Sequence, residues 1–130
     1  MSNDIEGVLD ASVLLAAMLG EIDDSEAAHW LANSCISAVN LSETIAKLAE
    51  RGYPRDFILA GIADFEVTVE AFEQKQAIRA GLMRPVTRAF GLSFADRACL
   101  ALAAELGRPA VTADRAWARL DLGVEIKLVR

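Results

Sequence analysis

The sequence predicts a three-layer α/β/α fold, with helices on both faces of a mainly parallel central sheet of about five strands. Short apolar segments alternate along the chain with segments of helical length that carry apolar residues at helical spacing. The composition agrees, because 54% of the residues are hydrophobic and only 6% are aromatic, as expected where small aliphatic side chains pack between helices and a parallel sheet. A chain of 130 residues has room for one core, so we expect a single domain over residues 1–130.

Five short apolar segments are the expected strands. The first, 7–9, is apolar throughout, which is typical of a central strand buried on both faces. In the last, Val124, Ile126 and Leu128 alternate with neighbours of which two are charged, and this pattern suits an edge strand. The five segments are 7–9, 35–39, 67–69, 110–112 and 124–129.

Capping residues mark the helices between these strands. Ser25, Asn40 and Ser93 are good N-caps, and Gly107 follows a helical segment. Pro85 lacks a backbone donor and should interrupt the helical stretch in which it lies. The expected helices are 11–20, 26–32, 41–51, 56–64, 73–91 with its break, 93–106 and a short helix around Trp117.

The sequence offers no sign of a membrane protein or of a secreted one. No apolar run reaches the roughly 18 residues that a membrane span needs. The first residues lack the basic region and apolar stretch of a secretory signal, so we expect the protein in the cytoplasm. Cys35 and Cys99 stand at no metal-ligand spacing, and we expect both as small buried hydrophobic side chains.

The formal charge of −6 is distributed unevenly. Residues 1–74 hold fourteen acids against three bases, whereas residues 75–130 hold ten bases against five acids. An acidic protein lacks a general electrostatic footprint for nucleic acid. One basic face beside an acidic cleft is nevertheless compatible with binding a polyanion through metal ions.

Four acids are predicted to meet at one edge of the sheet. Asp10 and Asp114 follow strands, whereas Glu43 and Asp96 are expected in the first turns of helices. The helices of such a fold begin at the edge where the parallel strands end, which is also where ligands bind. Asp64 and Glu66, at the end of a helix and the start of a strand, should lie at the opposite edge.

Taken singly, each of these acids has an alternative role as a helix cap. Residues 40–43 and 93–96 both match the spacing of a capping box. Taken together, four crowded carboxylates repel one another and raise each other's pKa unless a cation is present. Oxygen ligands of this kind suit Mg²⁺ or Mn²⁺, and the chemistry implied is metal-assisted hydrolysis of a phosphodiester. The hydroxyls of Ser12 and Thr112 can orient a carboxylate or a metal-bound water, or serve as ordinary caps.

The segments that carry the four acids resemble the acidic motifs of the PIN domain family, and more narrowly those of VapC toxins from bacterial type II toxin-antitoxin pairs. The resemblance runs in order from about Val8 to Val129, and the segment around Asp96 is the most specific. The segments are LDASVLLA at 9–16, SAVNLSE at 37–43, GLSFADRACLALA at 91–103 and VTADRAW at 111–117.

This resemblance implies a Mg²⁺- or Mn²⁺-dependent endoribonuclease that is usually a homodimer and is neutralised by a cognate VapB-type antitoxin. The family's acids correspond to Asp10, Glu43, Asp96 and Asp114, with none missing, which favours an active enzyme. A PIN nuclease of RNA processing, or a catalytically silent partner-binding module, remains an alternative.

An acidic protein needs cations to hold the RNA backbone on either side of the cleaved bond. The chain offers them in one stretch, which we predict to contact RNA unless it is simply a solvated helix face. The residues are Lys75, Arg79, Arg84, Arg88 and Arg97.

Two other families with a similar sheet are excluded by their motifs. A two-component receiver domain needs an Asp at the end of its third strand and a Lys at the end of its fifth, but the third predicted strand has no such Asp and Lys127 lies inside the last strand. A phosphatase of the haloacid dehalogenase type needs a second Asp two residues after the first, and Ser12 occupies that position.

Overall fold

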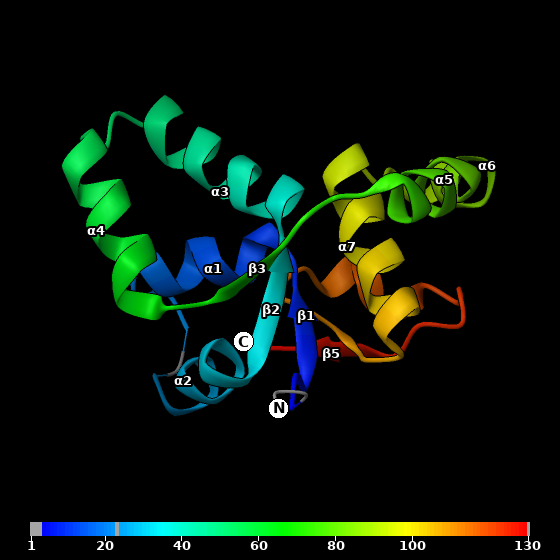
Figure 1. Ribbon diagram of the computed structural model, residues 1–130, viewed down its shortest axis with the longest axis horizontal. Coiled ribbons are helices and arrows are strands. Elements are labelled where there is room, and N and C mark those ends of the chain that lie inside the picture. The colour runs from blue at the N-terminus through cyan, green and yellow to red at the C-terminus, as the bar shows by residue number, and fades with distance from the viewer. Residues whose placement is uncertain (1–3, 23, 130) are drawn as a thin grey trace.

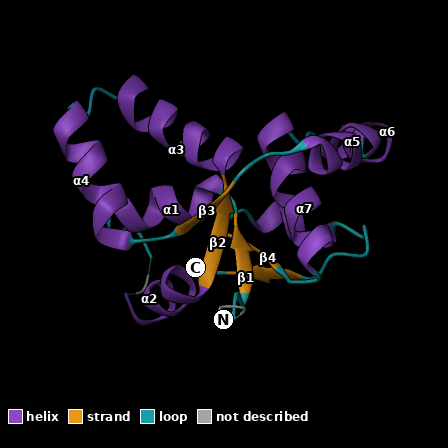
Figure 2. Ribbon diagram, in the orientation of Figure 1, coloured by secondary structure: helices purple, strands orange, loops and turns teal. Residues whose placement is uncertain are grey.

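The computed structural model describes residues 4–22 and 24–129 (Figure 1). Its five strands form one parallel sheet in the order β3-β2-β1-β4-β5, with helices on both faces (Figure 2). This confirms the predicted three-layer α/β/α fold, including the central place of the first strand and the edge position of the last. The strands are β1 (Gly7–Leu9), β2 (Ser34–Ser37), β3 (Thr68–Glu70), β4 (Ala110–Thr112) and β5 (Ile126–Leu128).

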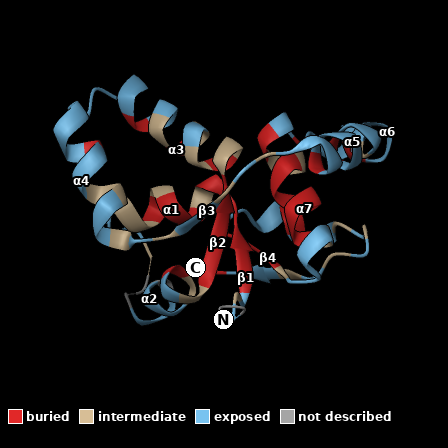
Figure 3. Ribbon diagram, in the orientation of Figure 1, coloured by how far each residue is buried: buried red, intermediate tan, exposed pale blue. Residues whose placement is uncertain are grey.

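Successive residues of the central strands supply the two halves of the core. Val8 packs with Leu100 and Trp117 on one face of the sheet, whereas Leu9 packs with Val13 and Leu14 on the other. The side chains alternate because a strand turns successive Cβ atoms to opposite faces. Both faces of β1 are consequently closed to solvent (Figure 3).

The helices fall into three groups around the sheet. The Leu9 face is covered by α1 and α2, and the Val8 face is covered by α7, which packs on α5. A third group, α3 and α4, extends away from the sheet beyond the end of β2 and is largely exposed (Figures 1 and 3). The bounds are α1 (Ala11–Met18), α2 (Asp24–Asn33), α3 (Ala38–Glu50), α4 (Arg55–Phe65), α5 (Gln74–Leu82), α6 (Arg84–Thr87), α7 (Phe94–Leu106), and the 3₁₀ helices η1 (Arg88–Phe90) and η2 (Arg115–Arg119).

The expected break in the stretch 73–91 falls at Met83, between α5 and α6, with Pro85 in the first turn of α6. Helix α5 runs antiparallel to α7. Lys75, near the start of α5, lies 3.9 Å from Glu105 near the end of α7, whereas Ala80, near the end of α5, accepts a hydrogen bond from Arg97 in α7. The end of α5 therefore lies close to the edge of the sheet at which α7 begins.

Two helices begin earlier than the sequence predicted. Helix α2 starts at Asp24, so the prediction that Ser25 caps it is wrong. Helix α3 starts at Ala38 and is capped by Ser37, whose hydroxyl accepts a hydrogen bond from the Val39 amide at 3.1 Å. Ser and Asn are nearly equal as caps, and the earlier candidate caps the helix because β2 ends at Ser37. Asn40 is therefore inside the helix and caps nothing.

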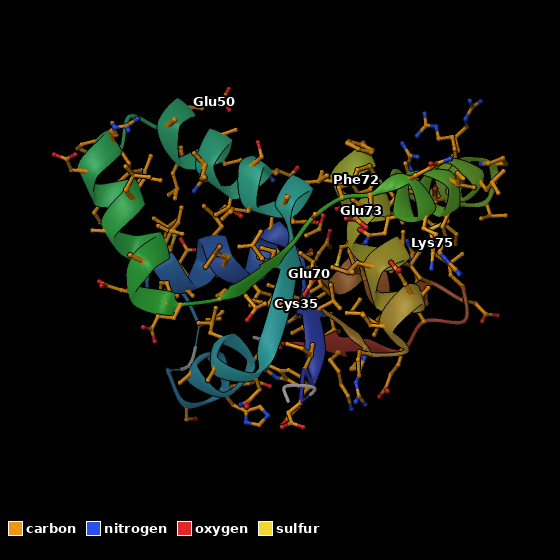
Figure 4. All side chains as sticks on the ribbon, viewed as in Figure 1. Cys35, Glu50, Glu70, Phe72, Glu73 and Lys75 are labelled. Carbon is orange, nitrogen blue, oxygen red and sulfur yellow. The ribbon has the colours of Figure 1, made fainter. Side chains whose placement is uncertain are left out.

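Both cysteines are buried free thiols, as expected. Burial, followed by the charge of Glu70, raises the pKa of Cys35 to about 12, and the two side chains come from neighbouring strands (Figure 4). Among the helices described for residues 4–22 and 24–129, none has the length and apolar character needed to cross a membrane.

Candidate active site

Asp10 lies where β1 ends and α1 begins, at the carboxyl edge of the sheet. Its amide donates to the Val111 carbonyl and so continues the pairing with β4. Its carboxylate caps α1 by accepting a hydrogen bond from the Val13 amide at 3.3 Å. The side chain is buried, with 4% of its surface exposed. A charged group so buried needs polar partners.

Two hydroxyl groups provide those partners, one for each carboxylate oxygen of Asp10. Ser12 donates to Oδ1 at 2.6 Å, and Thr112 donates to Oδ2 at 2.8 Å. The hydroxyls are themselves fixed, because Ser12 accepts from the Ala113 amide at 2.9 Å and Thr112 from the Asp114 amide at 3.0 Å. This network joins the ends of β1 and β4 and holds the carboxylate in one orientation.

Burial raises the pKa of Asp10 from its ordinary 3.8 to about 6. The hydrogen bonds from Ser12 and Thr112 oppose the increase, and the charge of Asp96 adds to it. Burial, rather than repulsion among four acids, is thus the main cause. That part of the expectation is wrong, because loss of hydration outweighs one neighbouring charge at this position.

Asp96 lies in the first turn of α7, as predicted. It forms a capping box with Ser93, in which Ser93 accepts from the Asp96 amide at 3.1 Å and the Asp96 carboxylate accepts from the Ser93 amide at 2.9 Å. The charges of Asp10 and Asp96, after burial, also raise the pKa of Cys99. Asp96 is therefore an electrostatic neighbour of Asp10 on the α7 side of β1.

Asp114 follows β4 and is joined to Asp10 through a shared partner. Its amide donates to Thr112, whose hydroxyl donates to Asp10. Its exposed carboxylate caps η2 by accepting from the Ala116 amide at 2.9 Å. Asp114 is thus at the predicted edge, with its side chain free of burial.

Glu43 departs from the prediction. Since α3 begins at Ala38, Glu43 lies in the second turn rather than the first, and it forms no capping box with Asn40. Its carboxylate is 27% exposed and lies 3.9 Å from the Lys47 ammonium group. It lines an open hollow between α3 and the start of α7, opposite Ser93 and Ala95. Glu43 therefore faces the segment that carries Asp96.

The four acids lie around one edge without meeting at a point. In the part of the chain that the structure describes, no three Asp, Glu, His or Cys side chains are grouped closely enough to hold a metal ion. The reason is that the carboxylates of Asp10, Asp96 and Asp114 are turned toward backbone amides that they cap. The donor set consists of carboxylate and hydroxyl oxygens, which are hard ligands.

The basic stretch is divided by the antiparallel packing of α5 on α7. Lys75 and Arg79 lie toward the end of α7, and Lys75 points away from the α3 side of the molecule (Figure 4). Arg97 is turned inward, where it donates to Ala80 at 2.9 Å and stacks on Phe94 at 5.9 Å. Arg84 and Arg88 are exposed and approach the acidic edge along the chain. The prediction for Arg97 is wrong in its surroundings, because its guanidinium joins two helices.

Asn40 is a residue of this region whose place the sequence did not reveal. Its side chain is fully buried, and its Nδ2 donates to the Ala95 carbonyl at 3.0 Å. The capping preference of Asn concealed this contact. A sequence signal was nevertheless available, since Ser37 offers an equally good cap three residues earlier.

A family comparison assigns the fold to a known group. The model of the PIN domain matches residues 7–122. The chain belongs to the PIN domain family. The resemblance seen in the sequence is thereby confirmed, and PIN domains are nucleases. No curated protein sequence matches the chain.

Solved structures of VapBC proteins share this fold. DNA-bound VapBC from Salmonella typhimurium is similar with a TM-score of 0.77 and 22% identity, over 95% of this chain and 97% of that one. VapBC-5, from a toxin-antitoxin family of Mycobacterium tuberculosis, gives 0.68 and 24%, over 96% and 99%. VapBC2 from Rickettsia felis, bound to a promoter DNA fragment, gives 0.75 and 15%, over 95% and 98%. At these identities the likeness is one of fold.

Proposed function

We propose that this PIN domain is a Mg²⁺-dependent endoribonuclease of the VapC type, which cleaves RNA in the cytoplasm and is neutralised by a VapB-type antitoxin. The observation that carries the proposal is the Asp10 carboxylate, buried at the carboxyl edge of the central strand and held by Ser12 and Thr112. Membership of a nuclease family and the VapBC neighbours support it.

The residues fit Mg²⁺ or Mn²⁺ in ligand type and in arrangement. Mg²⁺ keeps several of its waters and takes only one or two carboxylates directly, together with substrate phosphate. A single fixed carboxylate with three others around it satisfies this requirement without a cluster of three direct ligands. Asp10 would hold the ion, with Asp96, Glu43 and Asp114 as the surrounding acids. When bound, such an ion supplies an activated water and stabilises charge on the phosphate and leaving oxygen.

The protein's own contribution is to orient and to keep the site dry on one side. Ser12 and Thr112 each donate to one oxygen of Asp10, so the carboxylate keeps its outward lone pairs for a ligand. Val8 and Leu9, which precede it, are fully buried, so the site is backed by apolar core. Burial also raises the pKa of Asp10, which makes a neighbouring cation favourable.

The proposed partners follow from the charge of the site. An antitoxin segment lying across the acidic edge would carry an Arg or Lys in the position of the cation. We also propose a homodimer, in which basic residues of both copies lie along one RNA. VapBC-5 belongs to a family of toxin-antitoxin systems, and the likeness of fold to it supports an antitoxin here.

RNA cleavage tests the proposed function directly. Purified protein, free of antitoxin, should cleave total cellular RNA in Mg²⁺ and stop when the metal is chelated. Asp10→Asn should reduce cleavage by more than the roughly 10–100-fold that loss of an outer-shell partner causes. Asp64→Asn, an exposed acid at the end of α4, is the matched control and should cleave normally. Cleavage that survives chelation, or that Asp10→Asn leaves unchanged, would contradict the proposal.

A further inference from the structure

Asn40 connects the first turn of α3 with the first turn of α7. Its Nδ2 donates to the Ala95 carbonyl at 3.0 Å, and the side chain is fully buried. The two residues are 55 positions apart, so the bond fixes one helix against another rather than shaping a single helix. This contact lies beneath the hollow that Glu43 lines.

The bond joins the two segments that carry proposed metal-binding acids. Glu43 lies three residues after Asn40, on a neighbouring part of the same helix face. Asp96 directly follows Ala95. The hydrogen bond therefore sets how far the helix of Glu43 lies from the helix of Asp96.

The other half of the Asn40 amide is unpaired. Within the described part of the chain, Oδ1 is buried and has no hydrogen-bond partner. The amide cannot be turned around, because the Ala95 carbonyl requires a donor. A leucine would fill a similar volume without this unpaired oxygen, so the Asn side chain is disfavoured by burial unless its donor has a purpose.

The shape of the molecule shows what that purpose is. Helices α3 and α4 extend from the sheet and are largely exposed (Figure 3), and α3 contacts the rest of the fold mainly through α1 and α7. A displacement of α3 would carry Glu43 away from Asp96. Thr44 adds rigidity at this point, since its hydroxyl donates to the Asn40 carbonyl at 2.9 Å.

We infer that Asn40 is a positioning residue, which holds Glu43 at a fixed separation from Asp96 and thereby adapts the acidic edge to a divalent cation. The inference rests on the proposed function. It assigns Asn40 no contact with substrate or metal, because its effect is transmitted through Glu43.

Mn²⁺ titration calorimetry tests this inference without a cleavage assay. Asn40→Leu, which keeps the volume and removes the donor, should weaken Mn²⁺ binding about tenfold or more. Thr44→Val is the matched control, because it alters a buried side chain of the same helix whose hydrogen bond stays within that helix. Its Mn²⁺ affinity should equal that of the wild type. If Asn40→Leu does not fold by circular dichroism, Asn40→Ser removes the same bond with a smaller change.

A second background separates positioning from general destabilisation. In Glu43→Gln protein, the Asn40 substitution should cause no further loss of Mn²⁺ affinity, since the group it positions is gone. An equal loss in both backgrounds, or unchanged affinity in the wild-type background, would overturn the inference alone. Wild-type protein that binds no Mn²⁺ would overturn the proposed function, and the inference with it.

Discussion

Thr112 donates a hydrogen bond of 2.8 Å to Oδ2 of Asp10, across 102 residues of sequence. The bond connects the ends of two adjacent parallel strands, and the Thr112 hydroxyl at the same time accepts from the Asp114 amide. One side chain thus links two of the four acids. The contact opposes the effect of burial on Asp10, whose pKa is nevertheless raised to about 6.

The raised pKa of Asp10 predicts how metal-free stability varies with pH. A carboxyl whose pKa is higher in the folded protein binds its proton more tightly there. Its contribution to stability is therefore fully present below about pH 4 and is lost as the pH rises through about 6. A shift of this size corresponds to about 3 kcal/mol. Asp10→Asn should remove this dependence and raise the free energy of unfolding near neutral pH.

Urea unfolding in a metal chelator, between about pH 4 and 7, measures the effect. Asp64→Asn, an exposed acid at the opposite edge, should retain the wild-type dependence. Addition of Mg²⁺ should stabilise the wild type at neutral pH and leave Asp10→Asn little changed. If Asp10→Asn and the wild type show the same pH profile, the Asp10 side chain is hydrated rather than buried.

Ser93 and Asp96 allow helix capping to be separated from metal binding. Ser93→Ala removes the acceptor of the Asp96 amide and should destabilise the protein by about 1 kcal/mol, while cleavage remains. Asp96→Asn keeps an oxygen that can accept from the Ser93 amide, so its stability should change by less than about 0.5 kcal/mol while cleavage is lost. Thermal unfolding and RNA cleavage are measured on both variants. Full cleavage by Asp96→Asn would leave the acid a capping role only.

The sheet and the edge it presents were predictable because strands and their ends are local features of sequence. A short apolar run that ends on Asp10 determines both a buried strand and the place of its acid. The family motifs around Asp96 added the order of the acids along the chain.

What failed in the prediction depended on contacts between distant segments. Asn40 and Ser37 are both suitable caps, and only the end of β2 at Ser37 decides between them. Arg97 resembles its basic neighbours in sequence, but the approach of Ala80 from α5 turns its guanidinium inward. Neither outcome can be derived from the residues on either side.

The division of the basic stretch gives the last prediction, which concerns RNA. Arg84 and Arg88 are exposed and lie between the end of α5 and Ser93, which caps α7 at the acidic edge. Lys75 and Arg108 are also exposed, but they lie toward the far end of α7. We therefore expect the first pair to bind RNA phosphates and the second pair to bind none. Removal of one phosphate-binding side chain should flatten the log-log salt dependence of single-strand binding by roughly 0.7.

The measurement uses an Asp10→Asn background, in which the RNA stays intact during titration. Replacing Arg84 and Arg88 with Gln should lower the salt slope by up to about 1.4, since two phosphate-binding side chains are removed. Replacing Lys75 and Arg108 with Gln removes the same charge from the far end and should leave the slope unchanged, so long-range electrostatics cancel in the comparison. Equal slopes in the two double variants would show that RNA does not follow α6 and η1, and that its phosphates are held elsewhere on the protein.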